Sequence, residues 1–262
     1  MSKKWQLLLP MAGRGSRFTS AGYKLPKPFI QVQNVPMYQI VLDNLITDYI
    51  SSITLICLSE HKPFLENIDL EFRYQRPVKI VFLENVTDGA ARTVQKGLGA
   101  LEMDEPVLIA NSDQYLDCSM EWQSHFLSQN IDGVVLTSRD NDSKWSFARV
   151  VDGWVVEIAE KEVISNIATV GIYGFKSGNS LKWAIEQMIN KSLRVNGEFY
   201  LAPCYNQLVS RGDKIAIHHA GDLSSIFYGL GTPEDLELFL LALEKKTITS
   251  WKHYPDSEIS VM

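Results

Sequence analysis

The first loop of the chain reads Leu9-Pro10-Met11-Ala12-Gly13-Arg14-Gly15-Ser16-Arg17-Phe18 and follows the apolar segment Trp5–Met11, a predicted buried strand. Two glycines after a parallel strand let backbone N–H groups approach a phosphate chain without a Cβ in the way. A dinucleotide-binding Rossmann turn fits poorly, because Phe18 stands where that fold needs a third small residue. A P-loop is excluded because no Gly-Lys-Ser/Thr follows. The loop therefore predicts a phosphate site of another kind.

A basic, proline-fixed segment continues this loop as Gly22-Tyr23-Lys24-Leu25-Pro26-Lys27-Pro28. The prolines rule out a continuous helix from residue 15 to 30 and restrict the backbone around Lys27. Residues 1–42 carry six cations and no Asp or Glu, whereas the whole chain has a net charge of −6. This charge asymmetry predicts a local anion site rather than a general property of the surface.

Outward from this loop, short apolar runs alternate with helical patterns, which predicts a mostly parallel sheet with helices on both faces. We expect an α/β, three-layer fold with a mixed, mostly parallel central sheet. The predicted strands are Trp5–Met11, Ile53–Ser59, Val78–Leu83, Val107–Ala110 and Gly133–Ser138. The predicted helices between them are Met37–Tyr49, Ala90–Leu101 and Met120–Ser128.

After about residue 140, the alternation of strands and helices gives way to strands joined by hairpins. This pattern is typical of a partly antiparallel region that packs onto the first sheet. Asp152-Gly153 predicts a tight hairpin turn between strands Trp145–Val151 and Trp154–Ile158. We expect one domain over residues 1–246, with two halves (1–140 and 141–246), and a tail (247–262). The remaining predicted elements are strands Ala168–Phe175 and Lys214–His219 and helices Leu181–Ile189, Phe199–Val209 and Pro233–Leu243.

Composition excludes several classes of protein. No apolar run reaches the ~18–20 residues of a membrane span, and no secretory leader is evident. Three scattered cysteines indicate buried thiols in a reducing compartment, so we predict a cytoplasmic protein. The pI near 5.4 disfavours nucleic-acid binding.

The combination Gly13-x-Gly15-x-Arg17 and Pro26-Lys27-Pro28, followed by a helix after Pro36, resembles the signature of the sugar-phosphate nucleotidyltransferases, or nucleoside-diphosphate-sugar pyrophosphorylases. The resemblance runs over roughly residues 5–243. It implies a GT-A/Rossmann-like fold in which the half 1–140 binds the nucleotide and the half 141–246 binds the acceptor. It implies that the glycine loop and Arg17 hold a triphosphate while Lys27 stabilises the charge moving onto pyrophosphate. The nucleotide would lie against Met11, Ala12, Gly13 and Gly15.

Two further segments match the nucleotide side of this family. Asp88-Gly89-Ala90 resembles the turn against which the base lies, although Asp88 is equally explained as a helix N-cap. Asn111-Ser112-Asp113 follows a predicted parallel strand, and Asp113 matches the family's metal-binding aspartate, which implies Mg²⁺ as cofactor. A turn aspartate at the end of a strand is the simpler alternative for Asp113.

Three segments match the acceptor side of the family. Lys161 follows Glu160 as in the family's Glu-Lys motif, whose lysine contacts the acceptor phosphate. Gly171 lies in a strand like the family's glycine-containing acceptor strand. Glu198 matches a glutamate that binds sugar hydroxyls, although an acid favoured by a helix dipole explains it equally well.

One departure concerns the second metal aspartate of the family. Its position in the block Phe227-Tyr228-Gly229-Leu230-Gly231 is held by Gly229. Either a single carboxylate suffices, with water and phosphate completing the metal shell, or another acid substitutes. Asp222 is the nearest acid in sequence.

The resemblance implies transfer of an NMP unit from an NTP to a sugar 1-phosphate or similar small phosphomonoester, with release of pyrophosphate, for cell-surface polysaccharide precursors. The compact Asp88-Gly89 turn favours a pyrimidine, as CTP, UTP or dTTP. A homo-oligomer is compatible with the sequence. Two alternatives stay open: a GT-A glycosyltransferase that uses a nucleotide sugar, and a nucleotide-binding protein of weakened activity.

Overall fold

The computed structural model describes residues 3–251 of the chain, and its central feature is one nine-stranded sheet. Seven strands follow one another in the order β10-β9-β11-β6-β1-β4-β5, and β8 and β12 extend the sheet from β11. The strands are β1 (Trp5–Pro10), β4 (Ile50–Leu58), β5 (Val78–Leu83), β6 (Val107–Ala110), β8 (Gly133–Arg139), β9 (Ser146–Val151), β10 (Trp154–Glu160), β11 (Ile167–Phe175) and β12 (Ile215–His219).

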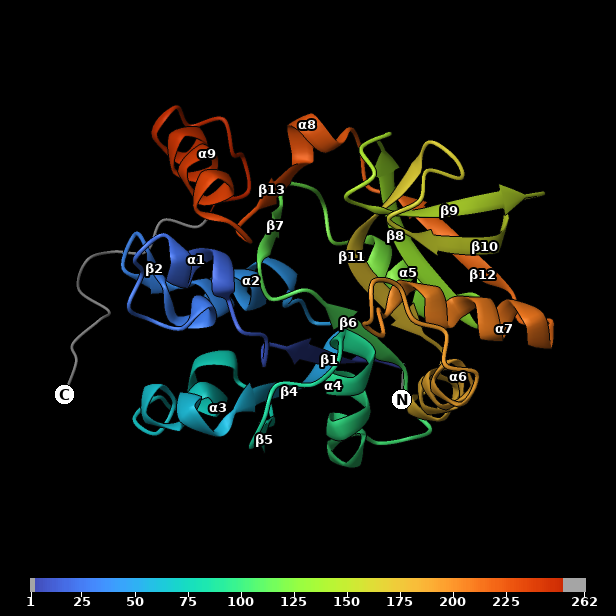
Figure 1. The fold of residues 1–262 in the computed structure, drawn as a ribbon, viewed down its shortest axis with the longest axis horizontal. Coiled ribbons are helices and arrows are strands. Elements are labelled where there is room, and N and C mark those ends of the chain that lie inside the picture. The colour runs from blue at the N-terminus through green and yellow to red at the C-terminus, as the bar shows by residue number, and fades with distance from the viewer. Residues whose placement is uncertain (1–2, 252–262) are drawn as a thin grey trace.

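Parallel pairing centres on β1 and β4 and antiparallel pairing on β9 and β11, although the outer strand β12 pairs parallel with β8. Strand β1 pairs parallel with β4 and β6, and β4 pairs parallel with β5. Strand β11 runs antiparallel to β6 and β8, and β9 and β10 form an antiparallel hairpin. Figure 1 shows β8–β11 gathered at the upper right, away from β1, β4 and β5. The predicted mixed sheet is confirmed, and its antiparallel part is continuous with its parallel part.

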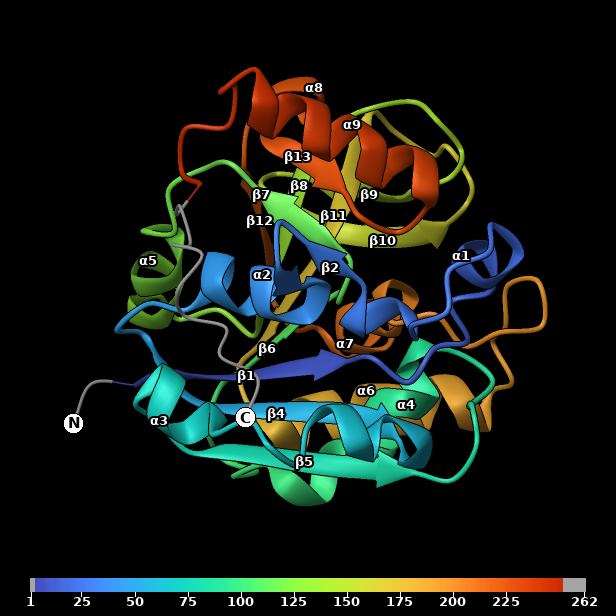
Figure 2. The same ribbon diagram turned by 90° about the vertical axis from the view of Figure 1, so that its left-hand side faces the viewer.

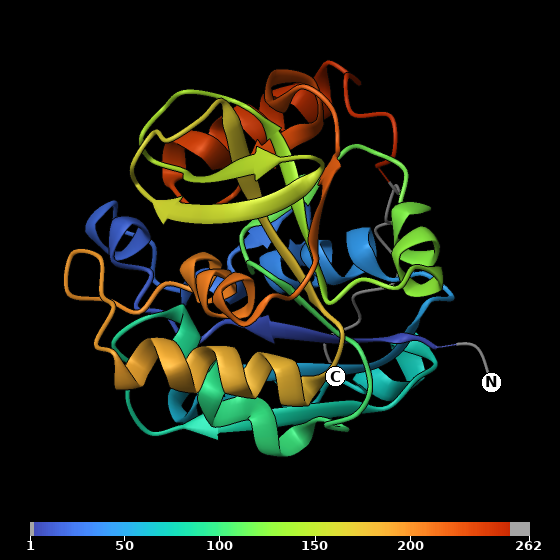
Figure 3. The same cartoon turned by 90° about the vertical axis from the view of Figure 1, so that its right-hand side faces the viewer.

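Helices cover both faces of the sheet, because alternate residues of each strand point to opposite faces. Leu7 and Leu9 of β1 pack with one set of helices, and Leu8 packs with the other. Figure 3 shows the face covered by the second set. The first set is α2 (Met37–Leu45), α3 (Leu70–Tyr74) and α5 (Trp122–Ser128); the second is α4 (Ala90–Gly97), α6 (Gly178–Asn190) and α7 (Tyr205–Arg211).

A third apolar cluster lies beyond the sheet, beneath α9 (Pro233–Glu244). It joins Phe18, Met37 and Phe239, all almost fully buried. Figure 2 shows α9 at the top of the molecule, above α2. The other elements are α1 (Ser16–Ser20), α8 (Leu223–Ile226), the short strands β2 (Gln31–Val32), β3 (Val35–Pro36), β7 (Gln114–Leu116) and β13 (Phe227–Gly229), and the 3₁₀ turns η1 (Lys27–Phe29), η2 (Ser59–Phe64), η3 (Leu98–Ala100) and η4 (Ala202–Cys204).

Several predicted boundaries are wrong for identifiable reasons. The helix predicted to Tyr49 ends at Leu45, because the following turn is held by Arg76, which donates to the carbonyls of Thr47 and Ile50. The helix predicted from Phe199 begins only at Tyr205, after η4. The hairpin at Asp152-Gly153 is confirmed, with both residues at positive φ.

The predicted tail from residue 247 is described only as far as residue 251; residues 252–262 lie outside the described range. The described part packs on the domain: Asp117 accepts hydrogen bonds from Thr249 and from the Ser250 amide. Within residues 3–251, no helix combines the length and the apolar character needed to cross a bilayer.

Candidate active site

A cavity of about 820 Å³ opens where the parallel and antiparallel parts of the sheet meet. The carboxyl ends of parallel strands are the usual position of ligands in α/β sheets. One side, which we call the parallel wall, comprises residues 10–16, 27–28, 86–90, 93 and 111–113. The facing side, the antiparallel wall, comprises residues 144–146, 160, 169, 171, 173, 198 and 200–202.

The glycine loop and the lysine of the parallel wall fit together through Gly15. Its φ of +59° is left-handed, and it is the N-cap of α1. A Cβ on Gly15 would lie 2.9 Å from the Cβ of Lys27, too close for two carbon atoms. Glycine is therefore required twice over at position 15, for its backbone angle and for the approach of Lys27.

Lys27 and Asp113 form an ion pair inside the cavity. The Nζ of Lys27 lies 2.6 Å from Oδ2 of Asp113, and their side chains are 20% and 27% exposed. Pro26 precedes the 3₁₀ turn that carries Lys27, and Asp113 follows the carboxyl end of β6. The structure thus brings together two residues that are 86 positions apart in sequence and that were singled out independently.

The turn at Gly89 closes the parallel wall. Gly89 has φ +128°, and a Cβ there would lie 2.4 Å from the carbonyl oxygen of Phe199. Ala90 begins α4, and both residues line the cavity. The other nucleotide-side residues singled out by sequence, Met11, Ala12 and Gly13, line it as well.

Arg17 does not line this cavity. It lies on α1 and borders a separate cleft beside Pro233 and Glu234 of α9. The next residue, Phe18, is buried in the third apolar cluster, and this burial fixes how the helix is turned. A five-residue helix was not expected here, and a phosphate role for Arg17 remains a prediction.

The antiparallel wall owes its shape to a bulge at Gly171. Its φ is +71°, and a Cβ there would lie 2.3 Å from Nδ2 of Asn111 and 2.6 Å from Oε1 of Gln114. The register of β11 against β8 shifts between Thr169 and Tyr173, as expected for a bulge. This glycine lets the end of β6 approach β11 closely.

Lys161 and Tyr200 form a second polar contact beside the cavity. Lys161 Nζ donates to the Tyr200 hydroxyl at 2.6 Å and lies 4.7 Å from the centre of its ring. This hydrogen bond raises the pKa of Lys161. Tyr200 lines the cavity, whereas Lys161 reaches it only through Tyr200.

Two glutamates contribute negative charge to the antiparallel wall. Glu198 and Glu160 both line the cavity, and Ser146 donates a hydrogen bond to Glu160. Desolvation raises the pKa of Glu160, and the charge of Glu198 acts in the same direction. Ser146 and Lys161 oppose that shift without cancelling it.

Sequence reasoning missed part of the antiparallel wall. Trp145, Tyr173 and Tyr200 line the cavity, together with Lys144. Each of the three aromatic residues stands next to or within a predicted element, and nothing in the local pattern separates a cavity-facing ring from a core ring. The adjacency of Tyr200 to the Gly197-Glu198 pair was the one available signal.

Gly229 holds the position where the resemblance expects a second metal-binding aspartate. Gly229 pairs with Gln114, and a Cβ on it would lie 3.1 Å from Cγ of Asp235. A Cβ on Gly231 would lie 2.8 Å from Oδ2 of Asp113. Asp222, the substitute considered from sequence, is the N-cap of α8 and does not line the cavity. Among residues 3–251, no group of three or more His, Cys, Asp or Glu side chains is arranged to hold a metal.

Comparisons with known proteins agree with this arrangement. The nucleoside-diphosphate-sugar pyrophosphorylase of Vibrio cholerae RC9 superposes with a TM-score of 0.77 at 22% identity, over 90% of this chain and 100% of that chain. The inositol-1-phosphate CTP transferase of T. maritima gives 0.74 at 15% identity, over 97% and 99%. A UDP-glucose pyrophosphorylase in complex with UDP-glucose gives 0.75 at 16% identity, over 93% and 99%. These likenesses show the fold.

No curated protein sequence matches the chain. Residues 8–200, in contrast, match the family described as Nucleotidyl transferase, and this match spans both cavity walls up to Tyr200. The chain therefore belongs to the nucleotidyl transferase family.

Proposed function

We propose that the protein transfers an NMP unit from an NTP to a small phosphomonoester, such as a sugar 1-phosphate, and releases pyrophosphate. The observation that carries this proposal is the Lys27–Asp113 pair, 2.6 Å apart in a cavity between a glycine loop and two acceptor-side glutamates. The nucleophile in such a reaction is an acceptor phosphate oxygen, which is already anionic near neutral pH. Catalysis then needs alignment and charge stabilisation rather than a general base.

On the parallel wall, the triphosphate would lie against the Gly13–Gly15 backbone. Lys27 would place its ammonium beside the phosphates and stabilise the charge that develops on the departing pyrophosphate. The base would lie against Gly89 and Ala90, both of which line the cavity. Arg17 would take part only if α1 turned toward the cavity.

On the antiparallel wall, Lys161 would hold the acceptor phosphate and Glu198 would bind acceptor hydroxyls. Lys161 already lies beside the cavity through its hydrogen bond to Tyr200. The bulge at Gly171 would let the acceptor approach the end of β6. Opposed cationic groups on the two walls would force the two anionic substrates into line.

Asp113 is the residue that would hold Mg²⁺. Its carboxylate lines the cavity at the end of a parallel strand, and oxygen donors are what this ion prefers. A single protein carboxylate fits Mg²⁺ when phosphates and water fill the other positions, which is common for this ion. When bound, the ion would neutralise phosphate charge and orient the triphosphate.

A pyrimidine nucleotide, as CTP, UTP or dTTP, is the preferred donor in this proposal. The compact Asp88-Gly89 turn supports it, as do the names of two structural relatives, one a CTP transferase and one bound to UDP-glucose. A role in making polysaccharide precursors in the cytoplasm follows from the same proposal.

A substrate panel tests the proposed function. Purified protein is incubated with Mg²⁺, each of five NTPs, and a set of hexose, heptose, polyol and choline phosphates, and pyrophosphate release is measured. We expect at least one pyrimidine pair to release pyrophosphate well above the Asp113→Ala variant. If no pair does so, the transferase proposal fails. A parallel incubation with nucleotide sugars in place of NTPs tests the alternative, and their consumption without pyrophosphate release would support a glycosyltransferase.

A further inference from the structure

The turn at Asp88 and the segment that carries Glu198 are joined by backbone hydrogen bonds. The amide of Phe199 donates to the carbonyl of Asp88 at 2.8 Å, and the amide of Ala91 donates to the carbonyl of Phe199 at 3.0 Å. Gly89 lies between these bonds, in direct contact with the Phe199 backbone. The two cavity walls therefore meet at this point without an intervening layer.

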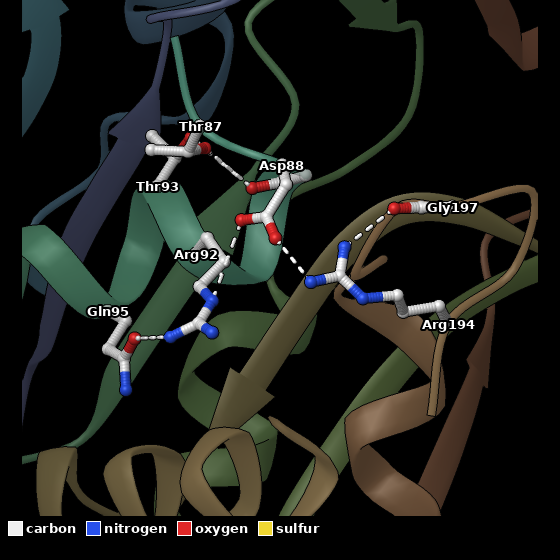
Figure 4. A network of polar contacts seen from close by, with 8 residues as sticks. Thr87, Asp88, Arg92, Thr93, Gln95, Arg194 and Gly197 are labelled. Carbon is white, nitrogen blue, oxygen red and sulfur yellow. Dashed lines mark hydrogen bonds and ion pairs between the residues drawn. The ribbon is translucent and has the colours of Figure 1, made fainter. Parts of the chain in front are cut away.

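Side chains reinforce the same junction, as Figure 4 shows. The carboxylate of Asp88 accepts a hydrogen bond from Nη2 of Arg194 at 2.6 Å, and Nε of Arg92 lies 3.5 Å from its other oxygen. The two guanidinium carbons lie 3.9 Å and 5.2 Å from the centre of the Phe199 ring. One carboxylate thus links two arginines that both contact the same buried ring.

Arg194 carries this contact onward to the segment that presents Glu198. Its Nη1 donates to the carbonyl of Gly197 at 2.7 Å (Figure 4). Asn196 and Gly197 form a tight turn at φ +48° and +83°. Val195 and Glu198 close the turn with two hydrogen bonds of 3.0 Å. We call residues 195–198 the Glu198 hairpin.

The ion pair at Asp88 remains intact at neutral pH. Desolvation alone would raise the pKa of Asp88, but the hydrogen bond from Arg194 and the charges of Arg194 and Arg92 lower it overall. Arg194 also donates through two different N–H groups, one to Asp88 and one to Gly197. A lysine ammonium on its flexible stem cannot present two donors in this rigid geometry.

We propose that Arg194 is a positioning residue that couples the two substrates. Asp88 holds Arg194, Arg194 holds the Glu198 hairpin, and the hairpin sets the place of Glu198, so acceptor affinity depends on the nucleotide turn. This inference rests on the proposed function for the identity of the acceptor side. Coupling between two binding sites is reciprocal. Bound acceptor would therefore raise the affinity for nucleotide by the same factor by which bound nucleotide raises the affinity for acceptor.

Hydrogen exchange on the intact protein tests the structural half of this proposal without a substrate. We expect the hairpin amides to exchange several-fold faster in Arg194→Gln and Arg194→Lys than in the wild type. Arg149→Gln is the matched control, because Arg149 also forms an exposed ion pair, with Glu157 at 2.8 Å on the β9–β10 hairpin. Unchanged exchange of the Glu198 hairpin in both Arg194 variants would overturn the proposal.

Kinetics test the coupling itself, with the nucleotide and acceptor that give most pyrophosphate in the panel above. We expect Asp88→Asn and Arg194→Gln each to raise the acceptor KM about 5- to 10-fold. For Arg194→Gln, which lies outside the nucleotide turn, the nucleotide Kd measured without acceptor should change less than about twofold, and the acceptor should no longer strengthen nucleotide binding. Equal losses in both substrates would indicate a merely structural role and overturn the coupling.

The double variant Asp88→Asn/Arg194→Gln shows whether the two residues act through one interaction or independently. If Asp88 acts through Arg194, the combination should raise the acceptor KM no more than either single change, whereas independent effects would multiply. Should no substrate pair react at all, the proposed function fails, while the exchange measurement still decides whether Arg194 holds the hairpin.

Discussion

The two walls of the cavity are built differently. The parallel wall depends on backbone shape at Gly15 and Gly89, whose φ values favour glycine and where a Cβ would collide with the neighbouring chain. The antiparallel wall carries three large aromatic side chains, Trp145, Tyr173 and Tyr200. A triphosphate offers the same oxygens whatever the base, so backbone amides suit it. Acceptors differ in shape, and side chains can be exchanged without refolding the wall.

The largest expected effect lies on the parallel wall, at Lys27. Lys27→Ala should lower kcat by about 10²–10³, comparable with the loss of one charge-stabilising donor. It also leaves Asp113 without its ion-pair partner inside the cavity. The measurement is pyrophosphate release under saturating substrates, with a melting curve to confirm folding.

Lys24→Ala is the matched control for Lys27, because Lys24 belongs to the same loop and is exposed outside the cavity. It should retain turnover within about twofold. A near-normal kcat in Lys27→Ala would show that Lys27 does not stabilise the charge that develops in the reaction.

The second effect tests whether the parallel wall depends on backbone shape. Gly89→Ala places a Cβ 2.4 Å from the Phe199 carbonyl at φ +128°, so the free energy of unfolding should fall by at least ~2 kcal/mol. Gly99→Ala is the control, since a Cβ there meets no atom within 4 Å. Chemical denaturation measures the free energy of unfolding of both variants. Equal values would show that the turn accommodates a Cβ at position 89 at little cost.

The same contrast explains what the sequence could predict. Strands Val78–Leu83 and Val107–Ala110 were predicted to the residue, because each is a short β-branched or apolar run bounded by turn residues. Gly13, Gly15 and Lys27 were identified from glycine and proline spacing, and Gly89 from the resemblance to the family's base-binding turn; all four line the cavity. The parallel wall was therefore visible in the sequence.

The antiparallel wall was much less visible. Tyr173 lies at the bulge in β11 and Tyr200 follows the Glu198 hairpin, and no local pattern encodes either feature. The same holds for Arg17, whose direction is set by the burial of Phe18 beneath α9, more than 200 residues away. The pairing of β7 with β13 was likewise not predicted, since each strand has only three residues.

A third, smaller effect should be confined to the acceptor. Lys161→Ala removes a cation beside the antiparallel wall, so the acceptor KM should rise about 10-fold, as for loss of one charged hydrogen bond. The nucleotide KM should stay within about twofold. Lys182→Ala, which removes an exposed cation on α6, should leave both constants unchanged. If the nucleotide KM rose instead, the assignment of the two walls would be reversed.

The smallest effect concerns the stability that the protein loses by placing the Glu160 carboxylate in the antiparallel wall. Desolvation raises the pKa of Glu160 above 4.5, so the folded protein binds this proton more tightly than the unfolded chain does. Ionisation of Glu160 therefore costs stability once the pH exceeds its folded pKa, and the cost disappears as the pH falls toward 4.5. Glu160→Gln should raise Tm at pH 7 on the order of 2 °C.

The control for this change is Glu157→Gln on the same strand, where the glutamate is exposed and ion-paired with Arg149 and no gain is expected. Melting curves from pH 4 to pH 8 should show the gain of Glu160→Gln shrinking toward acid. A gain that is constant with pH would mean that packing, and not charge, limits this position. A loss at pH 7 would show that the hydrogen bond from Ser146 outweighs desolvation, and the antiparallel wall would then carry no charge penalty at Glu160.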